Sequence, residues 1–275
     1  MTVTHLSAAP PGARAADDAT LHRLAEALRQ AEDDRRAIPP IIAGNPALTV
    51  ADAYQIQLLN IQGRISAGAR VVGRKVGLTS RAMQLMMGVD EPDFGVLLDD
   101  MLVEEGDAVP VADLVQPRVE AEIALVLGRD LRGPGVSSTA ALQAVASATA
   151  SIEIIDSRIT DWKIGLIDTI ADNASSARFV VAGRRTPVEG LDLRLIGMAL
   201  SINGELLETG AGAAVLGNPV RCVAWLANKL ASYGEQLNAG DVILAGSLHR
   251  AIPVKPGDSV VAEFDRLGSV RTRFS

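Results

Sequence analysis

Two glutamates two residues apart, Glu120 and Glu122, have the types and spacing that could do chemistry. They lie in an apolar stretch, residues 119–127, with the pattern of a buried strand. Residues two apart in a strand share a face, so both carboxylates point the same way, about 6.5–7 Å apart at Cα. Neighbouring carboxylates in an apolar strand repel each other and are costly to desolvate. A divalent cation between them would relieve both costs, and oxygen ligands favour Mg²⁺, Mn²⁺ or Ca²⁺ over zinc.

A solvated edge strand is the alternative explanation for a Glu-x-Glu pattern. Residues 123–127 continue the strand without another charge, which indicates a central strand. By themselves these residues leave both explanations open.

Three further residues could contribute to such a site. Glu153 lies in a second apolar strand, and a third buried carboxylate there would complete a metal site. Lys75 lies in an expected strand and turn over residues 71–79, where a surface lysine is the ordinary alternative. Asp93 lies in a Pro-Asp-Phe-Gly turn signal, where an aspartate ordinarily bonds turn backbone.

Composition limits the class of protein. The chain has 275 residues, 48% hydrophobic and 21% charged, which is typical of a soluble globular protein with a substantial core. A net charge of −7 without a Lys/Arg cluster argues against a nucleic-acid or anionic-membrane surface. No apolar run approaches about 18 residues, and no basic region precedes an apolar block, so we expect no membrane span, no secretory signal and a cytoplasmic location.

The chain divides into three parts by pattern. Residues 1–18, rich in Ala, Pro and Gly, are expected to be a disordered tail. Residues 19–70 form a helical region, in which Thr20 is the expected N-cap of a helix over 20–37. Thr49 opens a second helix, to about residue 66, with Asp52 completing a capping box. Residues 71–275 are a β-rich catalytic domain of short strands and Gly-rich turns.

This β-rich part has few expected helices, over 80–87, 139–149 and 218–233, the last with Asn218 as N-cap. Small residues just before it would let an anion approach backbone N–H groups, although a tight loop fits equally. In the strand over 151–158, Asp156 and Arg158 could form a structural ion pair. Asn203-Gly204 predicts a hairpin. The lack of βαβ alternation argues against a Rossmann or TIM architecture.

Six segments together resemble one family, and their shared order carries a resemblance that each alone would not. They are GRKVGLTS (73–80), PDFG (92–95), PRVEAEIA (117–124), EIIDSR (153–158), DNASS (172–176) and GAAVLGNP (212–219). Over residues 20–275 the chain resembles the 2-keto-4-pentenoate hydratase / 4-oxalocrotonate decarboxylase family, within the fumarylacetoacetate hydrolase superfamily.

The resemblance implies an α+β fold, with the N-terminal helical region packed on a C-terminal mixed β-roll or barrel of the fumarylacetoacetate hydrolase C-terminal type. It implies a Mg²⁺ or Mn²⁺ cofactor held by Glu120, Glu122 and Glu153. Lys75 and Asp93 would be the acid/base pair. The remaining residues that it assigns to substrate binding are Ser175, Ala213, Ala214, Val215, Leu216 and Ser247.

The implied activity is that of a hydratase in the meta-cleavage degradation of aromatic compounds. It would add water to 2-hydroxypenta-2,4-dienoate to give 4-hydroxy-2-oxopentanoate. The 1-carboxylate and 2-oxygen of this substrate can chelate a metal that acts as a Lewis acid. A lysine beside a cation in a dry pocket should have a lowered pKa, which is useful for proton transfer. Asp93 would hold or share that proton.

Other activities in the family stay open. A decarboxylase acting on 4-oxalocrotonate (2-oxohex-3-enedioate) needs the same enolate-stabilising site, although residues 161–164, 209–212 and 245–248 look more like the hydratase branch. A hydratase for 2-oxohept-4-ene-1,7-dioate would need an extra cation for the distal carboxylate. His249 with Arg250 could supply that cation, and an exposed His-Arg turn is the ordinary alternative.

The expected partners follow from the same resemblance. The ligand would be a small 2-hydroxydienoate or 2-oxo acid, and the chain would be a homo-oligomer, associated in some pathways with an aldolase or a decarboxylase. A metal-binding partner subunit of a hydratase–decarboxylase complex is the non-enzymatic alternative. Intact Lys75, Asp93 and the three glutamates argue against an inactive paralogue.

Overall fold

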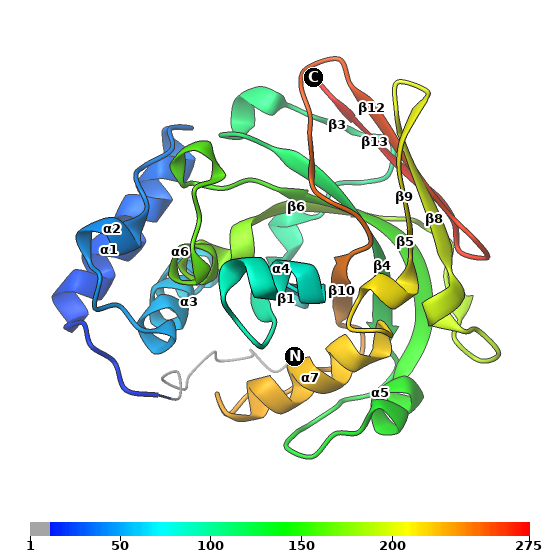
Figure 1. Ribbon diagram of the computed structural model, residues 1–275, viewed down its shortest axis with the longest axis horizontal. Helices are drawn as coiled ribbons and strands as arrows, with labels where there is room; N and C mark the ends of the chain where they lie inside the picture. Colours follow the sequence, from blue (N-terminus) through cyan, green and yellow to red (C-terminus); the bar gives the residue numbers. More distant parts are fainter. Residues whose placement is uncertain (1–11) are drawn as a thin grey trace.

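The computed structural model describes residues 12–275, apart from the side chains of Met86 and Met87, so most of the expected tail lies outside the described residues. Figure 1 shows a group of helices beside a large curved sheet, with a smaller sheet on the side away from them. Its α-helices are α1 Asp18–Asp33, α2 Ile41–Gly44, α3 Val50–Ser66, α4 Arg81–Met87, α5 Ser138–Ala144, α6 Leu166–Ala171 and α7 Val220–Ala231. No helix in the described part of the chain is long and apolar enough to cross a membrane.

The strands follow residue 70, as the change in sequence pattern predicts. They are β1 Val71–Gly77, β2 Asp93–Leu98, β3 Ala108–Val109, β4 Arg118–Leu127, β5 Val145–Ile155, β6 Ser176–Val181, β7 Thr186–Pro187, β8 Gly197–Ile202, β9 Glu205–Ala211, β10 Val242–Ser247, β11 Ile252–Pro253, β12 Ser259–Phe264 and β13 Gly268–Phe274. Helices and mixed sheets together confirm the α+β class.

The N-terminal helices differ from the prediction at the ends of α1. Asp17, not Thr20, is the N-cap, because its side chain accepts a hydrogen bond from the Thr20 N–H. The helix ends at Asp33, four residues before the predicted end. It is amphipathic, and its buried residues are Leu21, Leu24, Ala25, Leu28 and Ala31.

Helix α3 begins and ends where the sequence predicts, with the Thr49–Asp52 capping box in place. The Asp52 carboxylate also accepts the N–H groups of Ala15 and Ala16. The expected disordered tail therefore has an attached segment at its end. Helix α3 packs between α1 and α6, which joins the helical region to the rest of the chain.

β4 lies inside the larger sheet. The strand order is β2-β1-β10-β4-β5-β6, with β11 also pairing with β4 and β7 with β5. β4 is antiparallel to both β10 and β5, and seven of its ten residues are buried. The solvated-edge explanation of the Glu-x-Glu pattern is therefore wrong, because both sides of this strand are paired.

The larger sheet curls until its outer strands approach each other. The Asn173 side chain, just before β6, donates to the Val96 carbonyl of β2 at 3.0 Å and accepts from its N–H at 2.8 Å. An isolated bridge joins Leu102 and Phe179 nearby. Within the described chain the β2 and β6 ladders do not join, so the sheet is a roll and not a closed barrel.

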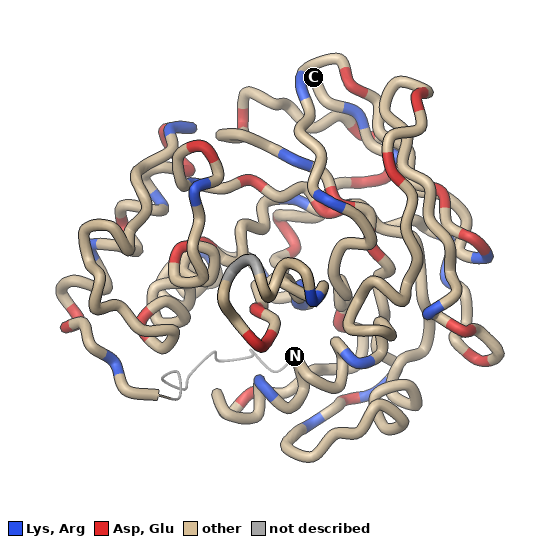
Figure 2. The backbone as a smooth tube through the Cα atoms, in the orientation of Figure 1, with Lys and Arg blue, Asp and Glu red and all other residues tan. Residues whose placement is uncertain are grey.

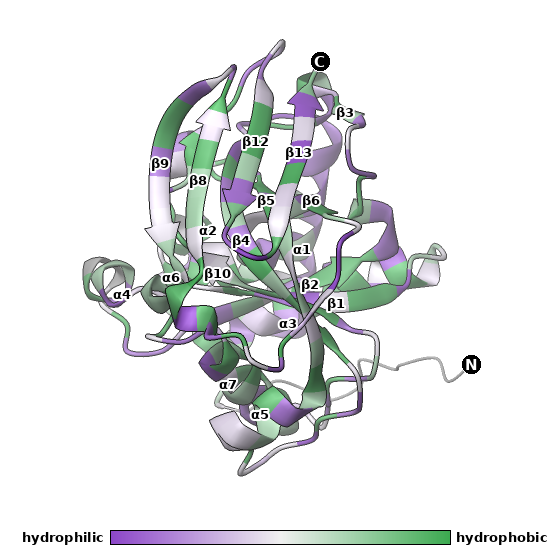
Figure 3. Cartoon of the chain, turned by 90° about the vertical axis from the view of Figure 1, so that its right-hand side faces the viewer, coloured by the Kyte–Doolittle hydropathy of each residue, from purple (hydrophilic) through white to green (hydrophobic). Residues whose placement is uncertain are grey.

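The smaller sheet has the order β3-β13-β12-β8-β9 and packs through β12 and β13 on β5. Figure 3 shows its strands standing against the larger sheet, with polar and apolar positions alternating along them. This period of two turns one face of β8, β12 and β13 to the core. The buried residues of β12 and β13 are Val260, Ala262, Phe264, Val270, Thr272 and Phe274.

Three local predictions need correction. The helix predicted over 139–149 ends at Ala144, and β5 begins at Val145, because pairing with β4 overrides the weak helix preference of an Ala-rich segment. Asp93 begins strand β2 and is not in a turn, since it pairs with Gly77 of β1. Helix α7 spans Val220–Ala231 and so ends two residues before the predicted Tyr233, while the Asn218 side chain accepts the Val220 N–H at 3.0 Å, as its predicted capping role requires.

Candidate active site

Acidic positions are spread along the whole described chain, in the middle of the view as well as at its rim (Figure 2). Glu120 and Glu122 occupy alternate positions of β4 and so share one face of the strand. Glu153 of β5 is the cross-strand partner of Glu120. Each of the three offers a carboxylate oxygen, and these oxygens lie within 4.8 Å of one another. The strand register thus brings together the three predicted metal ligands.

Burial makes this cluster unfavourable as three free carboxylates. Glu122 is 1% exposed and Glu153 is fully buried, whereas Glu120 is partly exposed. Burial, with the charge of Glu153 added, raises the pKa of Glu120 to about 7 against the opposing effect of Lys75. Burial and then the charges of Glu153 and Glu120 raise the pKa of Glu122 well above its usual value. Without a metal the cluster therefore holds protons that a cation would displace.

The carboxylate oxygens receive few hydrogen bonds. Neither oxygen of Glu153 has a hydrogen-bond partner among the described residues. Oε2 of Glu122 accepts the Gly246 N–H at 2.8 Å. Buried carboxylates with so few donors require a cation, and a ligand set made only of carboxylate oxygens suits a hard divalent ion. These three residues fit such an ion.

Lys75 of β1 lies against the cluster. Its ammonium nitrogen is 3.4 Å from Oε2 of Glu153 and donates to the Ala174 carbonyl oxygen at 3.0 Å. Burial would lower the pKa of Lys75, but the charges of Glu153 and Glu120 outweigh burial and the pKa is raised. The expected lowered pKa does not hold without a metal. For the metal-loaded site it stays a prediction, because a cation would neutralise those carboxylates.

Asp93 begins the strand beside Lys75. Burial raises the pKa of Asp93, and the charge of Lys75 partly offsets this. Its Oδ2 accepts the Thr169 hydroxyl at 3.4 Å, while Oδ1 has no hydrogen-bond partner in the described part of the chain. One oxygen of this buried carboxyl group is therefore free to exchange a proton.

Two glycines give Lys75 and Asp93 the space to meet. The β1–β2 register pairs Lys75 with Gly95 and Asp93 with Gly77. A Cβ added at Gly77 would lie 2.2 Å from Oδ1 of Asp93 and 3.5 Å from Nζ of Lys75. A Cβ added at Gly95 would lie 3.1 Å from Cγ of Lys75. Both functional groups thus lie beside Gly77, in space that a side chain there would occupy.

Ser175 comes from a left-handed turn. Asn173, Ala174 and Ser175 have φ angles of 53°, 52° and 55°, a conformation that costs about 1–2 kcal/mol per residue. The turn directs the Ala174 carbonyl at Lys75 and leaves the buried Ser175 hydroxyl without a hydrogen-bond partner among the described residues. Its role in substrate binding stays a prediction.

The segment before α7 reaches the glutamates through one intermediate loop. The Leu216 N–H donates to the Thr79 carbonyl oxygen at 3.1 Å. Thr79 lies directly beside Gly246, because a Cβ added at that glycine would lie 2.3 Å from the Thr79 hydroxyl oxygen. Gly246 in turn bonds Glu122. This chain of contacts places Leu216 at the border of the site.

The other predicted substrate residues have no side-chain hydrogen bond to the glutamates in the described structure. Val215 is buried, and Ala213 and Ala214 are exposed. The Ser247 hydroxyl donates to the His249 carbonyl oxygen at 2.7 Å, within its own loop. Contact of these residues with a substrate stays a prediction.

His249 and Arg250 do not have the environment expected of a cation that binds a distal carboxylate. The two ring nitrogens of His249 lie 2.8 Å from the Ala121 N and 2.5 Å from the Arg250 carbonyl oxygen, and burial lowers the pKa of His249. Arg250 is exposed and pairs with Glu208 at 2.6 Å. The imidazole is therefore neutral, and the arginine already has an ion-pair partner. Neither residue provides a free cation for the distal carboxylate of a substrate.

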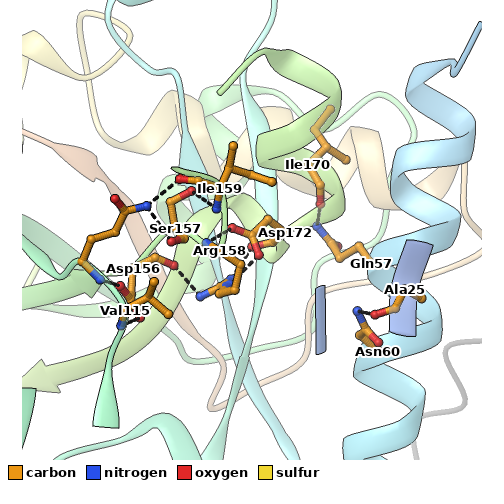
Figure 4. A network of polar contacts seen from close by, with 11 residues as sticks. Ala25, Gln57, Asn60, Val115, Asp156, Ser157, Arg158, Ile159, Ile170 and Asp172 are labelled. Atoms are coloured by element: carbon orange, nitrogen blue, oxygen red, sulfur yellow. Dashed lines mark hydrogen bonds and ion pairs between the residues drawn. The ribbon is translucent and has the colours of Figure 1, made fainter. Parts of the chain in front are cut away.

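A buried polar network joins the residues that follow β5 to Asp172 (Figure 4). Arg158 pairs with Asp172 and not with Asp156, which corrects the predicted ion pair. Asp156 instead accepts the N–H groups of Val115 and Gln116 at 2.8 and 2.6 Å. The Arg158–Asp172 pair joins the end of β5 to the turn that carries Ser175.

Several functional contacts could not be found in the sequence. The Gly246 N–H and the Ala174 carbonyl are backbone groups, which carry no residue signature. Thr169 reaches Asp93 from a helix 76 residues further along the chain. The glycine pair did leave a signal, since Lys75 and Asp93 are each followed two residues later by a glycine.

The family model and the most similar known proteins point to the same group of enzymes. Residues 68–275 match the family described as Fumarylacetoacetate (FAA) hydrolase C-terminal. The chain is 48% identical over 250 residues to the 2-keto-4-pentenoate hydratase of Paraburkholderia xenovorans (strain LB400), covering 91% of this chain and 93% of that protein. It is 43% identical over 251 residues to the 4-oxalocrotonate decarboxylase of Pseudomonas sp. (strain CF600), covering 91% and 95%.

A solved structure extends this likeness to three dimensions. The 4-oxalocrotonate decarboxylase from Pseudomonas putida G7, complexed with magnesium and adipate, superposes with a TM-score of 0.92 at 41% identity. The superposition covers 96% of this chain and all of that one. Sequence, fold and carboxylate cluster agree, and the chain belongs to the fumarylacetoacetate hydrolase C-terminal family, among its 2-keto-4-pentenoate hydratase and 4-oxalocrotonate decarboxylase members.

Proposed function

We propose that this chain is a hydro-lyase that adds water to 2-hydroxypenta-2,4-dienoate (2-keto-4-pentenoate) and releases 4-hydroxy-2-oxopentanoate. The observation that carries the proposal is the convergence of three carboxylates beside a Lys–Asp pair. The 48% identity to a 2-keto-4-pentenoate hydratase supports the choice of reaction.

The glutamates would hold the cofactor. A divalent cation, when bound, supplies Lewis-acid stabilisation to the enolate of a 2-oxo acid. Glu120, Glu122 and Glu153 are its ligands in this proposal; Glu122 and Glu153 are buried, and the partly exposed Glu120 lies on the side open to solvent. We take Mg²⁺ as the first candidate, because a relative that superposes closely contains magnesium, with Mn²⁺ as the alternative.

Lys75 and Asp93 move the protons. One proton leaves the 2-hydroxyl of the dienol and one is delivered to C5, which gives 2-oxopent-3-enoate. Water then adds its oxygen to C4, and C3 takes a proton, so that the product differs from the substrate by one water molecule. The Lys75 ammonium is the proton donor, and Asp93 shares the proton through its free oxygen.

The ultraviolet absorbance of the dienol gives the direct test. Purified protein with Mg²⁺ should consume 2-hydroxypenta-2,4-dienoate, EDTA should stop the reaction, and added Mg²⁺ should restore it. Lys75→Met should remove turnover while leaving metal binding intact. If the protein did not consume 2-hydroxypenta-2,4-dienoate in a metal-dependent way, the hydratase proposal would be wrong.

A decarboxylase acting on 4-oxalocrotonate is the second candidate, and one observation favours it besides the likeness to such enzymes. Arg118 lies two residues before Glu120 on the same strand face. Its guanidinium carbon stacks 4.5 Å over the Trp162 ring, and it has no carboxylate ion-pair partner among the described residues. It is therefore a better-placed cation for a distal carboxylate than His249.

Two substrates separate the candidates. If Arg118 binds a distal carboxylate, Arg118→Met should raise the KM for 2-oxohex-3-enedioate and leave the KM for 2-hydroxypenta-2,4-dienoate unchanged. Release of carbon dioxide from the dicarboxylate faster than hydration of the dienol would reverse the preferred assignment. An equal effect of Arg118→Met on both substrates would place Arg118 at their common carboxylate.

The wider setting proposed for the chain is the meta-cleavage degradation of aromatic compounds in the cytoplasm. The substrate is a small 2-hydroxydienoate, and the active form is a homo-oligomer that works beside an aldolase or decarboxylase of the same pathway. Light scattering of the purified protein measures the number of subunits in the homo-oligomer. Co-purification tests the association with an aldolase or decarboxylase of the same pathway.

A further inference from the structure

On the side of β4 that faces β10 and β11, the strand pairing has a gap between the two glutamates, whereas the pairing with β5 is continuous there. Strand β10 pairs with β4 up to Ser247, opposite Glu122, and β11 resumes at Ile252, opposite Val119. Ala121 lies opposite the intervening loop and is fully buried. An unpaired N–H at this position would be unfavourable, because no water could replace the missing strand partner.

The imidazole of His249 fills this gap. The Ala121 N–H donates to Nε2 of His249 at 2.8 Å, and the Leu248 N–H donates to the Ala121 carbonyl oxygen at 3.1 Å. A side chain thus replaces the strand partner that the loop does not provide. Gly246, near the end of β10, bonds Glu122 through its N–H, so β10 and the loop after it contact two adjacent residues of β4.

The hydrogen bonds fix the tautomer of His249. A carbonyl oxygen only accepts, so Nδ1, 2.5 Å from the Arg250 carbonyl oxygen, carries the proton. Nε2 is then the acceptor that the Ala121 N–H requires. The charged neighbours, Arg250 and Glu208, pair with each other.

We propose that His249 is a positioning residue for the metal site, which holds the backbone of β4 between Glu120 and Glu122 and thereby sets the affinity for the cation. The inference rests on the proposed metal site. It assigns a purpose to a residue that contributes no ligand atom, since the backbone between the two glutamates sets how their carboxylates are oriented. On its other side this backbone is paired with β5, and His249 completes the pairing on the side of β10 and β11.

Solid-state ¹⁵N NMR of histidine-labelled protein tests the geometry without any metal. The chain has three histidines, and the signals that disappear in His249→Gln belong to His249. We expect a neutral ring protonated at Nδ1 and unprotonated at Nε2. A ring protonated at Nε2, or a charged ring at neutral pH, would overturn the proposal even if His249→Leu failed to fold.

Calorimetric Mg²⁺ titration tests the consequence. His249→Leu keeps the bulk but removes the acceptor, and it should weaken Mg²⁺ binding about tenfold to a hundredfold, as loss of a partner behind a ligand usually does. His249→Gln keeps an acceptor at the position of Nε2 and should stay within a few-fold of the wild type. His22→Leu, at an exposed histidine of α1, is the matched control and should bind normally.

The two variants separate positioning from simple stability. A folded His249→Leu protein with wild-type Mg²⁺ affinity would contradict the proposal, even if its melting temperature fell. Equal weakening in His249→Leu and His249→Gln would also contradict it, because the acceptor would then not matter. Failure of the wild-type protein to bind Mg²⁺ would instead refute the proposed metal site, while the NMR result would still report on the hydrogen bond.

Discussion

Glu153 shows how much depends on a single residue in this site. It is fully buried, and its ion-pair partner is the ammonium of Lys75 at 3.4 Å. One lysine cannot balance three glutamates and Asp93, which all raise its pKa. The residues by themselves therefore leave negative charge uncompensated in the interior, and a divalent cation is the simplest compensation.

Glu122→Gln tests the ligand assignment at nearly constant shape. The amide keeps an acceptor for the Gly246 N–H but removes one of the three charges. We expect Mg²⁺ binding to fall below calorimetric detection while the fold is retained. Glu263→Gln changes an exposed glutamate of β12 and should bind as the wild type does. If the Mg²⁺ titration of Glu122→Gln matched that of the wild type, Glu122 would not be a metal ligand.

The raised glutamate pKa values predict the pH dependence of the metal-free protein. An unfolded glutamate titrates near about 4.3, whereas Glu120 titrates at about 7 in the folded chain. The folded state therefore keeps protons that the unfolded state has released, and stability falls as pH rises through this window. Thermal unfolding in EDTA should show a falling melting temperature from about pH 5 to about pH 7.5.

Magnesium should remove most of this loss, because the cation replaces the protons. Glu122→Gln supplies the control, since it carries one fewer titrating carboxyl group and should have a shallower slope in EDTA. A slope identical to that of the wild type would show that groups elsewhere, such as Asp172, cause the pH dependence.

At the scale of elements, pairs of strands build the site. The β4–β5 register places Glu153 opposite Glu120, and the β1–β2 register places a glycine opposite each member of the Lys–Asp pair. A shift of one residue in either pairing would turn the functional side chains to the other face. The strand registers, more than the loops, therefore determine the chemistry.

Gly77→Ala tests this dependence on strand pairing. The new methyl group would lie 2.2 Å from Oδ1 of Asp93, so the carboxyl group must move. A displacement of about 1 Å can cost about a hundredfold in turnover, and we expect kcat to fall by that order with Mg²⁺ binding retained. Gly197→Ala, in a strand with open space beside the glycine, is the control. Turnover within twofold of the wild type would count against the predicted Lys–Asp geometry.

At the scale of the whole molecule, a buried ion pair connects the large sheet to the helical region. Arg158 and Asp172 are 4% and 3% exposed, and the burial of Asp172 raises its pKa to about 7 against the opposing effect of Arg158. Helix α6, which ends just before Asp172, is also the surface on which α3 packs. The pair therefore lies where the helical region, the large sheet and the Ser175 turn meet (Figure 4).

Arg158→Ala should destabilise the protein by about 3–5 kcal/mol, because it leaves a buried carboxylate without its partner. Urea unfolding with Mg²⁺ present measures the change in the free energy of unfolding. Arg194→Ala breaks an exposed pair with Asp192 and should cost less than about 1 kcal/mol. Equal effects of the two substitutions would contradict the structural role of the buried pair.

Much of this protein could be read from its sequence, because the relevant signals are local. The capping box at Thr49, the α+β class and the placing of Glu120 and Glu122 on one strand face all follow from short-range patterns. The order of six motifs identified the family and, through it, the predicted roles of Lys75, Asp93 and Glu153, which the local patterns had already singled out. Local propensity failed where pairing overrides it, at the start of β5 and at Asp93.

Only the tertiary structure decided which residues face one another. The register that sets Glu153 against Glu120, the transfer of the Arg158 ion pair to Asp172 and the use of His249 as a substitute strand partner all join residues distant in sequence. No local pattern encodes such contacts, since they depend on how strands align and where a loop leaves the sheet. The sequence by itself determined that two acids would share one face of an apolar strand, and the fold decided that this strand would be central and that the third acid would meet them.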